Sequence, residues 1–287
     1  MGGFMGDIQL VTDSTCDLSE DLLEAHDIEV IPLFVNFESE SYRDGVDIAT
    51  QEMYQKVDEV GDVPKTSAAS PASFEEVFEK HLEKGRKIIY TGIGSGFSAT
   101  LQNANIAKQK LESDDIYLID SQNLSSGSGL LLLKAAKYRA EGDDTATIAR
   151  KMRDLVPRVR TQFVIDTFEY LHKGGRIKAI SRFVGTSLRL KPIIKVVDNA
   201  MTVGKKGRGN IRQGIKLMLR DVLKDKGNVD EDFFMITHSM AGKQVPYIRE
   251  EVEKAFDVGN IYETQAGCVI SSHCGPGTIG VLYIVKP

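Results

Sequence analysis

The sequence predicts an α/β protein of two domains, and its length and two distinct patterns along the chain support this prediction. With 287 residues the chain is long enough for two domains of roughly 100–150 residues each. Its first half alternates strand-like apolar runs with segments of helical periodicity, which indicates a parallel sheet with helices on both faces. Its second half changes character after residue 160 and indicates a mixed, partly antiparallel sheet. We therefore expect domains at residues 1–160 and 161–287.

The elements of the first half follow from apolar runs and helical spacing. We expect strands at residues 8–12, 30–37, 87–92 and 115–120, and helices at 19–26, from 73 onward, at 99–111 and at 130–140. Ser73 and Glu76 have the spacing of a capping box, and Phe74 and Phe78 follow at helical intervals. The helix from residue 73 is therefore expected to begin at this serine.

The second half predicts hairpins as well as helices. We expect a strand-like start at 163–171, a helical repeat near 180–188, a hairpin over 193–203, a helix at 211–222, a strand at 233–239, a helix at 243–256 and two strands flanking 273–277. The hairpin prediction depends on Asp198 and Asn199, which are turn residues between two apolar runs. Between the last two strands we expect a tight turn that contains His273.

Composition excludes several classes of protein. The formal net charge of -5 leaves no basic excess for binding nucleic acid, and 41% hydrophobic residues with 27% charged ones is typical of a folded globular chain. The apolar runs fall well short of the ~20 residues that span a bilayer, so we expect a cytoplasmic protein without stable membrane insertion. Three cysteines without CxxC spacing indicate neither a disulfide framework nor a zinc site.

A glycine-rich segment at residues 92–100 is the most informative local pattern. It follows a strand and opens a helix, so its backbone N–H groups and the helix dipole could converge on an anion. Phe97 stands where a dinucleotide fingerprint needs glycine, and Thr100 stands where a nucleophile elbow needs glycine. Ser98 is therefore expected to cap the helix and donate to a ligand carboxylate, and a serine nucleophile is the alternative.

Four further segments carry polar groups that could face a ligand or serve structure alone. Asp13 and its neighbours could cap a helix or face a crevice at a strand end, and the hydroxyl-rich segment 64–71 could hold an anionic head group or be a solvated connection. Arg176 ends a cationic turn with two glycines, where it could bind an anion or lie in solvent. His273 could donate to an anion or to a backbone carbonyl.

Five motifs in register give the chain a resemblance to a known family. They are TDSTCDL at 12–18, PKTS at 64–67, SAT at 98–100, YLHKGGRI at 170–177 and HCGPG at 273–277. In this order they resemble the DegV family over essentially the whole chain. Ala68 and Ala69 stand where the family commonly has Gln-Pro, and Ala99 stands where it has glycine. Both departures leave the hydroxyls in place.

The resemblance implies two α/β domains that enclose a long-chain fatty acid between them. By this similarity Thr66 and Ser98 would hold the carboxylate, and His273 and Arg176 would lie near the carboxylate or near a partner's surface. The family's fatty acid kinase binding subunits present the bound acid to an ATP-dependent fatty acid kinase, which makes an acyl phosphate for phospholipid synthesis, and the resemblance implies the same role here. The chain itself would then carry no catalytic residue, metal or cofactor. Residues expected to line the acyl tunnel are Phe163, Ile180, Phe183, Val184 and Ile193.

Two other functions remain open from the sequence. One is an acyl-ester hydrolase that uses Ser98, His273 and either Asp120 or Asp166, in the chain order of α/β-hydrolases. The other is a ligand-sensing interaction protein that has no kinase partner.

Overall fold

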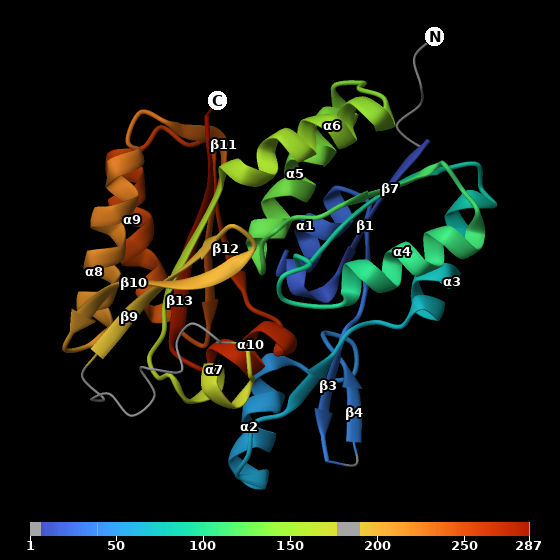
Figure 1. Ribbon diagram of the computed structural model, residues 1–287. Helices are drawn as coiled ribbons and strands as arrows, with labels where there is room; N and C mark the ends of the chain where they lie inside the picture. The colour runs from blue at the N-terminus through green and yellow to red at the C-terminus, as the bar shows by residue number, and fades with distance from the viewer. Residues whose placement is uncertain (1–6, 39, 177–189, 287) are drawn as a thin grey trace.

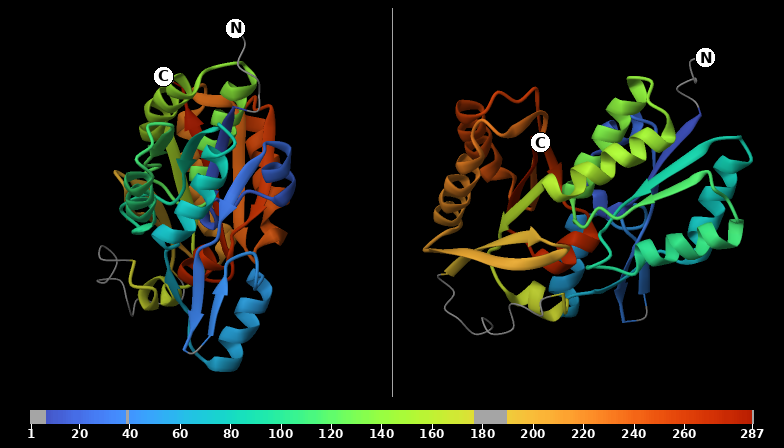
Figure 2. Two further views of the ribbon diagram at one scale, coloured as in Figure 1. Left: turned by 90° about the vertical axis from the view of Figure 1, so that its right-hand side faces the viewer. Right: turned by 45° about the horizontal axis from the view of Figure 1, so that its top comes forward.

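Two β-sheets lie on either side of a central helix, α5, in the computed structural model, which describes residues 7–38, 40–176 and 190–286 (Figure 1). From one side of the molecule to the other, helices, a sheet, α5 with its neighbours, a second sheet and further helices follow as successive layers. The second view in Figure 2 shows α5 and α6 between the two sheets. This layering confirms the predicted α/β fold with a parallel N-terminal sheet and a mixed C-terminal sheet.

The N-terminal sheet is parallel throughout, in the order β2-β1-β6-β7. Its strands are β1 (Ile8–Asp13), β2 (Ile28–Ile31), β6 (Lys87–Thr91) and β7 (Ile116–Ile119). Helices α3 (Pro71–Leu82) and α4 (Thr100–Leu111) pack on one face. Helices α1 (Glu20–Ala25), α5 (Ser126–Ala140) and α6 (Thr145–Leu155) pack on the other. The short 3-10 helix Ser14–Cys16 follows β1.

A small antiparallel sheet, absent from the sequence expectations, stands beside the N-terminal sheet. It consists of β3 (Phe34–Phe37), β4 (Glu40–Arg43) and β5 (Lys65–Ser67), with α2 (Thr50–Val60) next to it. The single strand expected at 30–37 is wrong, because the chain leaves the parallel sheet at Pro32, which has no N–H to donate to a ladder. The segment 64–71, for which no strand was expected, contains β5, in which Thr66 pairs with Val35 of β3.

The C-terminal sheet has the order β10-β9-β8-β13-β11-β12 and is antiparallel except between β11 and β12. Its strands are β8 (Val159–Val164), β9 (Leu190–Val197), β10 (Ala200–Arg208), β11 (Val229–Ser239), β12 (Asn260–Gln265) and β13 (Thr278–Val285). Asp198 and Asn199, with φ of 48° and 58°, form the turn between β9 and β10, which confirms the predicted hairpin.

Helices α8 (Ile211–Val222) and α9 (Val245–Ala255) cover the outer face of the C-terminal sheet. Single 3-10 turns lie at Val156–Arg158, Leu223–Asp225 and Gly242–Gln244. None of the helices in the described ranges combines the length and apolarity needed to cross a bilayer. The domain boundary expected near residue 160 falls where the chain enters β8, and it stays a prediction.

Two helix starts differ from the sequence expectations. The capping box at Ser73 is wrong, because α3 begins at Pro71 and Ser70 is its N-cap, with Oγ accepting from the Ser73 N–H at 3.2 Å. The tight turn expected around His273 is also wrong. This residue lies in the last turn of α10 (Cys268–Cys274), which packs against α7 (Glu169–Lys173), and Gly275 at φ 78° follows its end.

Helix α5 joins the two domains into one packed unit. Its residues 130–133 are fully buried. They share a single hydrophobic cluster with Leu10 and Ile89 of the N-terminal sheet and with Met235 and Leu282 of the C-terminal sheet. A helix that is apolar around most of its surface is typical of the interior of a large protein. The two domains are therefore held together by a continuous core.

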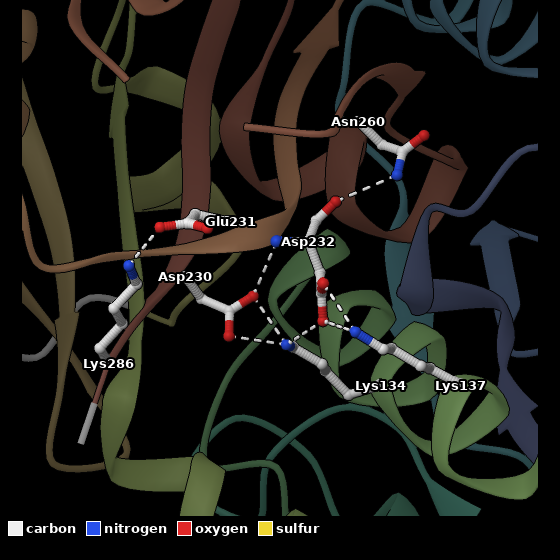
Figure 3. Close-up of polar contacts among 7 residues, drawn as sticks. All are labelled: Lys134, Lys137, Asp230, Glu231, Asp232, Asn260 and Lys286. Carbon is white, nitrogen blue, oxygen red and sulfur yellow. Dashed lines mark hydrogen bonds and ion pairs between the residues drawn. The ribbon is translucent and has the colours of Figure 1, made fainter. Parts of the chain in front are cut away.

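An ion cluster in the second half of α5 adds a polar contact between the domains (Figure 3). The Lys134 ammonium lies 2.7 Å from Asp230 and 2.6 Å from Asp232, both of which belong to β11. Lys137 shares Asp232 at 2.7 Å. The Lys134 side chain is 5% exposed, whereas that of Lys137 is 40% exposed, so only the first of these cations is desolvated.

We predict unequal costs when the two lysines are truncated. Lys134→Ala should lower the free energy of unfolding by about 2–3 kcal/mol, because it leaves two partly buried carboxylates without their central cation. Lys137→Ala, the matched control on the same helix, should cost less than about 1 kcal/mol, as exposed ion pairs do. Urea unfolding of both variants measures the difference. Equal losses would show that burial of Lys134 does not set the strength of this cluster.

Candidate functional site

A largely apolar cavity lies between the two domains, with about 900 Å³ of unfilled space including its mouth. The N-terminal half contributes Leu33, Ile93 and Leu124, and strands β8 and β13 contribute Phe163 and Leu282. Four of the polar residues predicted from sequence line this same cavity, namely Thr66, Ser98, Arg176 and His273.

Helix α10 forms part of the cavity wall and is held from across the domain interface. The Asp17 carboxylate accepts from the N–H of Gly267 at 2.8 Å, and the Asp44 carboxylate accepts from those of Cys268 at 2.7 Å and Val269 at 3.3 Å. The first amides of a helix have no partner within the helix, and they carry the positive end of its dipole. Two acceptors from the N-terminal domain therefore satisfy the start of a helix in the C-terminal domain.

Further contacts fix α10 against the N-terminal domain. The Tyr54 hydroxyl of α2 lies 2.7 Å from the Ser239 hydroxyl and donates to the Ser271 carbonyl at 3.1 Å. Burial raises the pKa of both Asp17 and Asp44, and the N–H groups that they accept from oppose this rise. The position of α10 is therefore set by Asp17, Asp44 and Tyr54, to which the sequence analysis assigned no role.

The imidazole of His273 forms a hydrogen-bonded pair with Thr66. Its Nε2 lies 2.8 Å from the Thr66 Oγ1, whereas its Nδ1 is buried and has no hydrogen-bond partner. A Cβ added to Gly174 would lie 2.2 Å from this Nδ1, so glycine is required where α7 meets the ring. We assign the proton to Nε2, because an N–H at Nδ1 would be buried without an acceptor. Thr66 then accepts from His273, and its own hydroxyl proton is free to donate into the cavity.

The environment of His273 keeps the ring neutral. Burial, and to a smaller extent the nearby Arg176 guanidinium, lowers the pKa of His273 to about 4. Arg176 itself is exposed at the end of α7, where it donates to the Gly174 carbonyl at 3.1 Å. This end of the cavity therefore carries the uncharged His273–Thr66 pair, with the permanently charged guanidinium of Arg176 near it.

Ser98 lies just before α4, and its Oγ is 2.7 Å from the Thr100 hydroxyl and accepts from the Thr100 N–H at 3.3 Å. The N-cap of α4 is Ala99 and not Ser98, so the expected capping role is wrong; Ser98 accepts only from the first amide of the helix, and it lines the cavity.

The anion site expected in the glycine-rich segment is not formed by the backbone of residues 93–96. These amides already donate to protein oxygens: Ile93 to Asp13, Gly94 to the Asn123 carbonyl, Ser95 to Asp120 and Gly96 to Asn199. The glycines instead permit close approach, since a Cβ on Gly96 would lie 2.0 Å from the Asn199 carbonyl oxygen. The segment holds the β9–β10 hairpin against the N-terminal domain. Ser98, rather than the backbone amides of residues 93–96, is the group of this segment that could donate to a ligand in the cavity.

A hydrolase triad is not assembled from the candidate residues. His273 Nε2 is engaged by Thr66 and its Nδ1 contacts no carboxylate, whereas a triad needs the imidazole between serine and carboxylate. Asp120 accepts from Ser95, and Asp166 accepts from Lys191 at 2.6 Å. The carboxylates that the hydrolase hypothesis named are therefore held elsewhere.

Comparison with known proteins identifies the family. The model described as "Uncharacterised protein, DegV family" matches residues 7–286. The chain belongs to the DegV family. A DegV domain-containing protein of Clostridium acetobutylicum is 36% identical over 282 residues, which are 98% of this chain and 100% of that protein. One from Caldanaerobacter subterraneus is 35% identical over 283 residues, again 98% of this chain and 100% of the relative.

Solved DegV structures share the whole fold. A DegV family protein from Thermus thermophilus, described by its fatty acid binding, superposes with a TM-score of 0.89 at 30% identity and covers 98% of this chain and 100% of its own. A stearic-acid-binding protein from Eubacterium ventriosum gives a TM-score of 0.86 at 29% identity, over 96% and 98% of the two chains. DegV of Bacillus subtilis, described as fatty-acid-binding, gives 0.83 at 26%, over 98% and 99%.

The apolar residues predicted for this DegV cavity have three different outcomes. Phe163 lines it, on the inner face of β8. Ile193 does not, because it pairs with Val164 and packs on the opposite face of the sheet against α8. Ile180, Phe183 and Val184 lie outside the described residues. Sequence reasoning missed several lining side chains, among them Leu124, Thr161, Met201 and Ile270, which belong to four separate segments.

The lowered pKa of His273 predicts a pH dependence of stability for the DegV fold. Between about pH 6.5 and 4 the unfolded chain binds a proton at this ring and the folded chain does not, so unfolding is favoured as the pH falls through this window. The loss should reach at most about 3 kcal/mol. His273→Gln, which keeps a donor toward Thr66, should unfold with a flatter pH dependence than the parent. Urea titrations at several pH values measure this, and parallel curves would contradict it.

Proposed function

We propose that this protein binds a long-chain fatty acid in the cavity between its domains, with the carboxylate at Thr66 and Ser98. The observation that carries the proposal is the Thr66–His273 pair at one end of an otherwise apolar cavity. Three related structures whose descriptions name fatty acids or stearic acid support it, because each shares the fold over nearly the whole chain. Such a ligand has one polar end and a long apolar body. The Thr66–His273 pair suits the polar end, and the apolar side chains of the cavity wall suit the body.

The head-group end offers donors that suit a carboxylate. In our proposal His273 donates to Thr66, and the Thr66 hydroxyl donates to one carboxylate oxygen, while the Ser98 hydroxyl donates to the ligand as well. A neutral imidazole orders the threonine without adding a buried charge. The exposed guanidinium of Arg176 lies at the same cavity and supplies positive potential toward the anion.

The tail supplies most of the binding free energy in this proposal. Burying about 14 methylenes at roughly 0.8 kcal/mol each gives on the order of 11 kcal/mol before association costs of about 4–15 kcal/mol. One hydroxyl that donates to a carboxylate contributes roughly 1.5–3 kcal/mol. The head-group hydroxyls should therefore determine which end group is accepted, and the cavity wall should determine affinity.

Titration with a fatty acid and with its methyl ester tests this division. Thr66→Ala and Ser98→Ala should each weaken fatty acid binding by about one to two decades without abolishing it, and should reduce the preference for the acid over the ester. Ser113→Ala, which removes a hydroxyl in the turn before β7, is the matched control and should behave like the parent. A parent that neither carries fatty acid after purification nor takes it up would refute the function. Unchanged discrimination in both variants would refute the head-group assignment.

We further propose that the bound acid is presented to an ATP-dependent fatty acid kinase, which forms an acyl phosphate for phospholipid synthesis. The proposal extends the family resemblance, and Arg176 is the residue that supports it. Its guanidinium is exposed, lies beside the head-group pair and cannot lose its proton, so it could meet a phosphoryl group or an acidic partner surface.

Arg176→Ala should leave fatty acid affinity within a few-fold of the parent and should strongly reduce acyl phosphate formation by the cognate kinase. The two effects should differ because the Arg176 side chain is exposed near the proposed carboxylate site, where it can meet the kinase, and does not pack against the acyl tail. Arg158→Ala removes a half-buried arginine in the turn before β8, outside the cavity lining, and serves as the control. Equal rates of acyl phosphate formation at limiting concentrations of parent and variant would exclude the role.

A further inference from the structure

The cavity extends along the C-terminal sheet away from His273. Thr278, Gly280 and Leu282 are alternate residues of β13, and all three line it. The Thr278 hydroxyl donates a hydrogen bond to the Cys274 carbonyl at the end of α10, so Thr278 lies at the end of the cavity where His273 is. Leu282 is four residues further along the strand, or about 13 Å at the usual rise of a β-strand. It pairs with Thr161 of β8, so Leu282 and Thr161 lie together at the far end.

This far end is closed by hydrogen-bonded polar groups. The Thr161 hydroxyl donates to the Asn123 side-chain carbonyl at 2.7 Å, and both residues are almost fully buried. A Cβ on Gly127, in the first turn of α5, would lie 2.2 Å from the Asn123 Oδ1 and 2.9 Å from the Thr161 Oγ1. Beside them Thr237 is hydrogen-bonded to Ser126. The floor is thus fixed against α5, where side chains cannot easily shift.

A second, polar cleft lies directly beyond this floor. It has about 1,300 Å³ of unfilled space including its mouth, and charged side chains such as Lys195 and Asp221 line it. Thr161 and Gln162 are the residues that line both the apolar cavity and this cleft. Because the Thr161 side chain is on the inner face of β8, it forms the partition between the two spaces.

We propose that Thr161, locked to Asn123, is the stop that sets the longest acyl chain the cavity accepts. The inference rests on the proposed fatty acid binding and deepens it. A tail that reaches this floor meets a hydrogen-bonded pair backed by α5, and further methylenes can enter only if that pair breaks or the chain folds back. A rigid polar floor of this kind gives a sharp upper limit, whereas a floor of mobile methyl groups would yield gradually.

A homologous series of saturated fatty acids, from dodecanoic to docosanoic acid, tests the stop. For the parent, the Kd should fall by up to about fourfold per methylene until the tail reaches Thr161, and should rise beyond that length. In Thr161→Ala the optimum should move to longer chains, and the rise should become a plateau, because surplus methylenes can enter the polar cleft. In Thr161→Leu the floor is raised, and the optimum should move to shorter chains.

Thr264→Ala is the matched control. This buried threonine of β12 is hydrogen-bonded to Thr237 but does not line the cavity. The dependence of Kd on acyl chain length should therefore be the same in this variant as in the parent. Thermal unfolding and circular dichroism identify any variant that fails to fold, and the two opposite changes at Thr161 keep the test decisive if one of them does. A parent that binds no acid of any length would overturn the proposed function itself. A parent that binds with an optimum unmoved in every folded Thr161 variant would overturn the stop alone.

Discussion

The candidate site depends on one interaction, the capture of the α10 N-terminus by the carboxylates of Asp17 and Asp44. Buried amides at a helix start are costly unless an acceptor reaches them, and here the acceptors come from the other domain. The same helix carries His273, so the hydrogen bond to Thr66 can form only when the two domains are docked in this way. Two carboxylates of the N-terminal domain therefore determine the geometry of a site that is assembled from both halves of the chain.

Helix α5 imposes the complementary constraint. Because it contributes to both sheets' cores at once, the sheets cannot separate without exposing a large apolar area. A ligand in the cavity must therefore enter and leave by local movement near the mouth, and the depth available to it is fixed by the first turn of this helix. Glycines in that turn bring the backbone close to its neighbours, as the contact of Gly129 with the Cys16 carbonyl illustrates.

The sequence predicted what local patterns determine and missed what distant contacts determine. The hairpin at Asp198 and Asn199 follows from turn chemistry alone, and the helix at 211–222 follows from its apolar spacing. By contrast, α10 is only seven residues long and is stabilised by Asp44, which is 224 positions away. Short helices without strong propensity depend on such tertiary contacts.

The candidate site follows the same division. Local patterns indicated its polar residues one by one, but only the family resemblance placed them at one site, because no periodicity could bring together Thr66 and His273, which are 207 positions apart. Ile193 was placed in the cavity on apolar character alone. In the structure Ile193 pairs with Val164, and the alternation of side chains along β9 places it on the other face of the sheet. The sequence of one strand does not reveal its register against the next strand, so this face could not be predicted. The floor at Thr161 escaped notice for a related reason, since a threonine in a strand gives no signal until its partner is known.

The three cysteines have a consequence for the chemistry of the native chain. Cys16, Cys268 and Cys274 are buried, and burial raises the pKa of each thiol to about 12. The thiolate is the form that reacts with electrophiles and oxidants, so near neutral pH these sulfurs are almost inert while the protein is folded. A cysteine introduced on the surface would consequently be modified selectively, and a fluorophore or cross-linker could be attached there without replacing any of the three native cysteines.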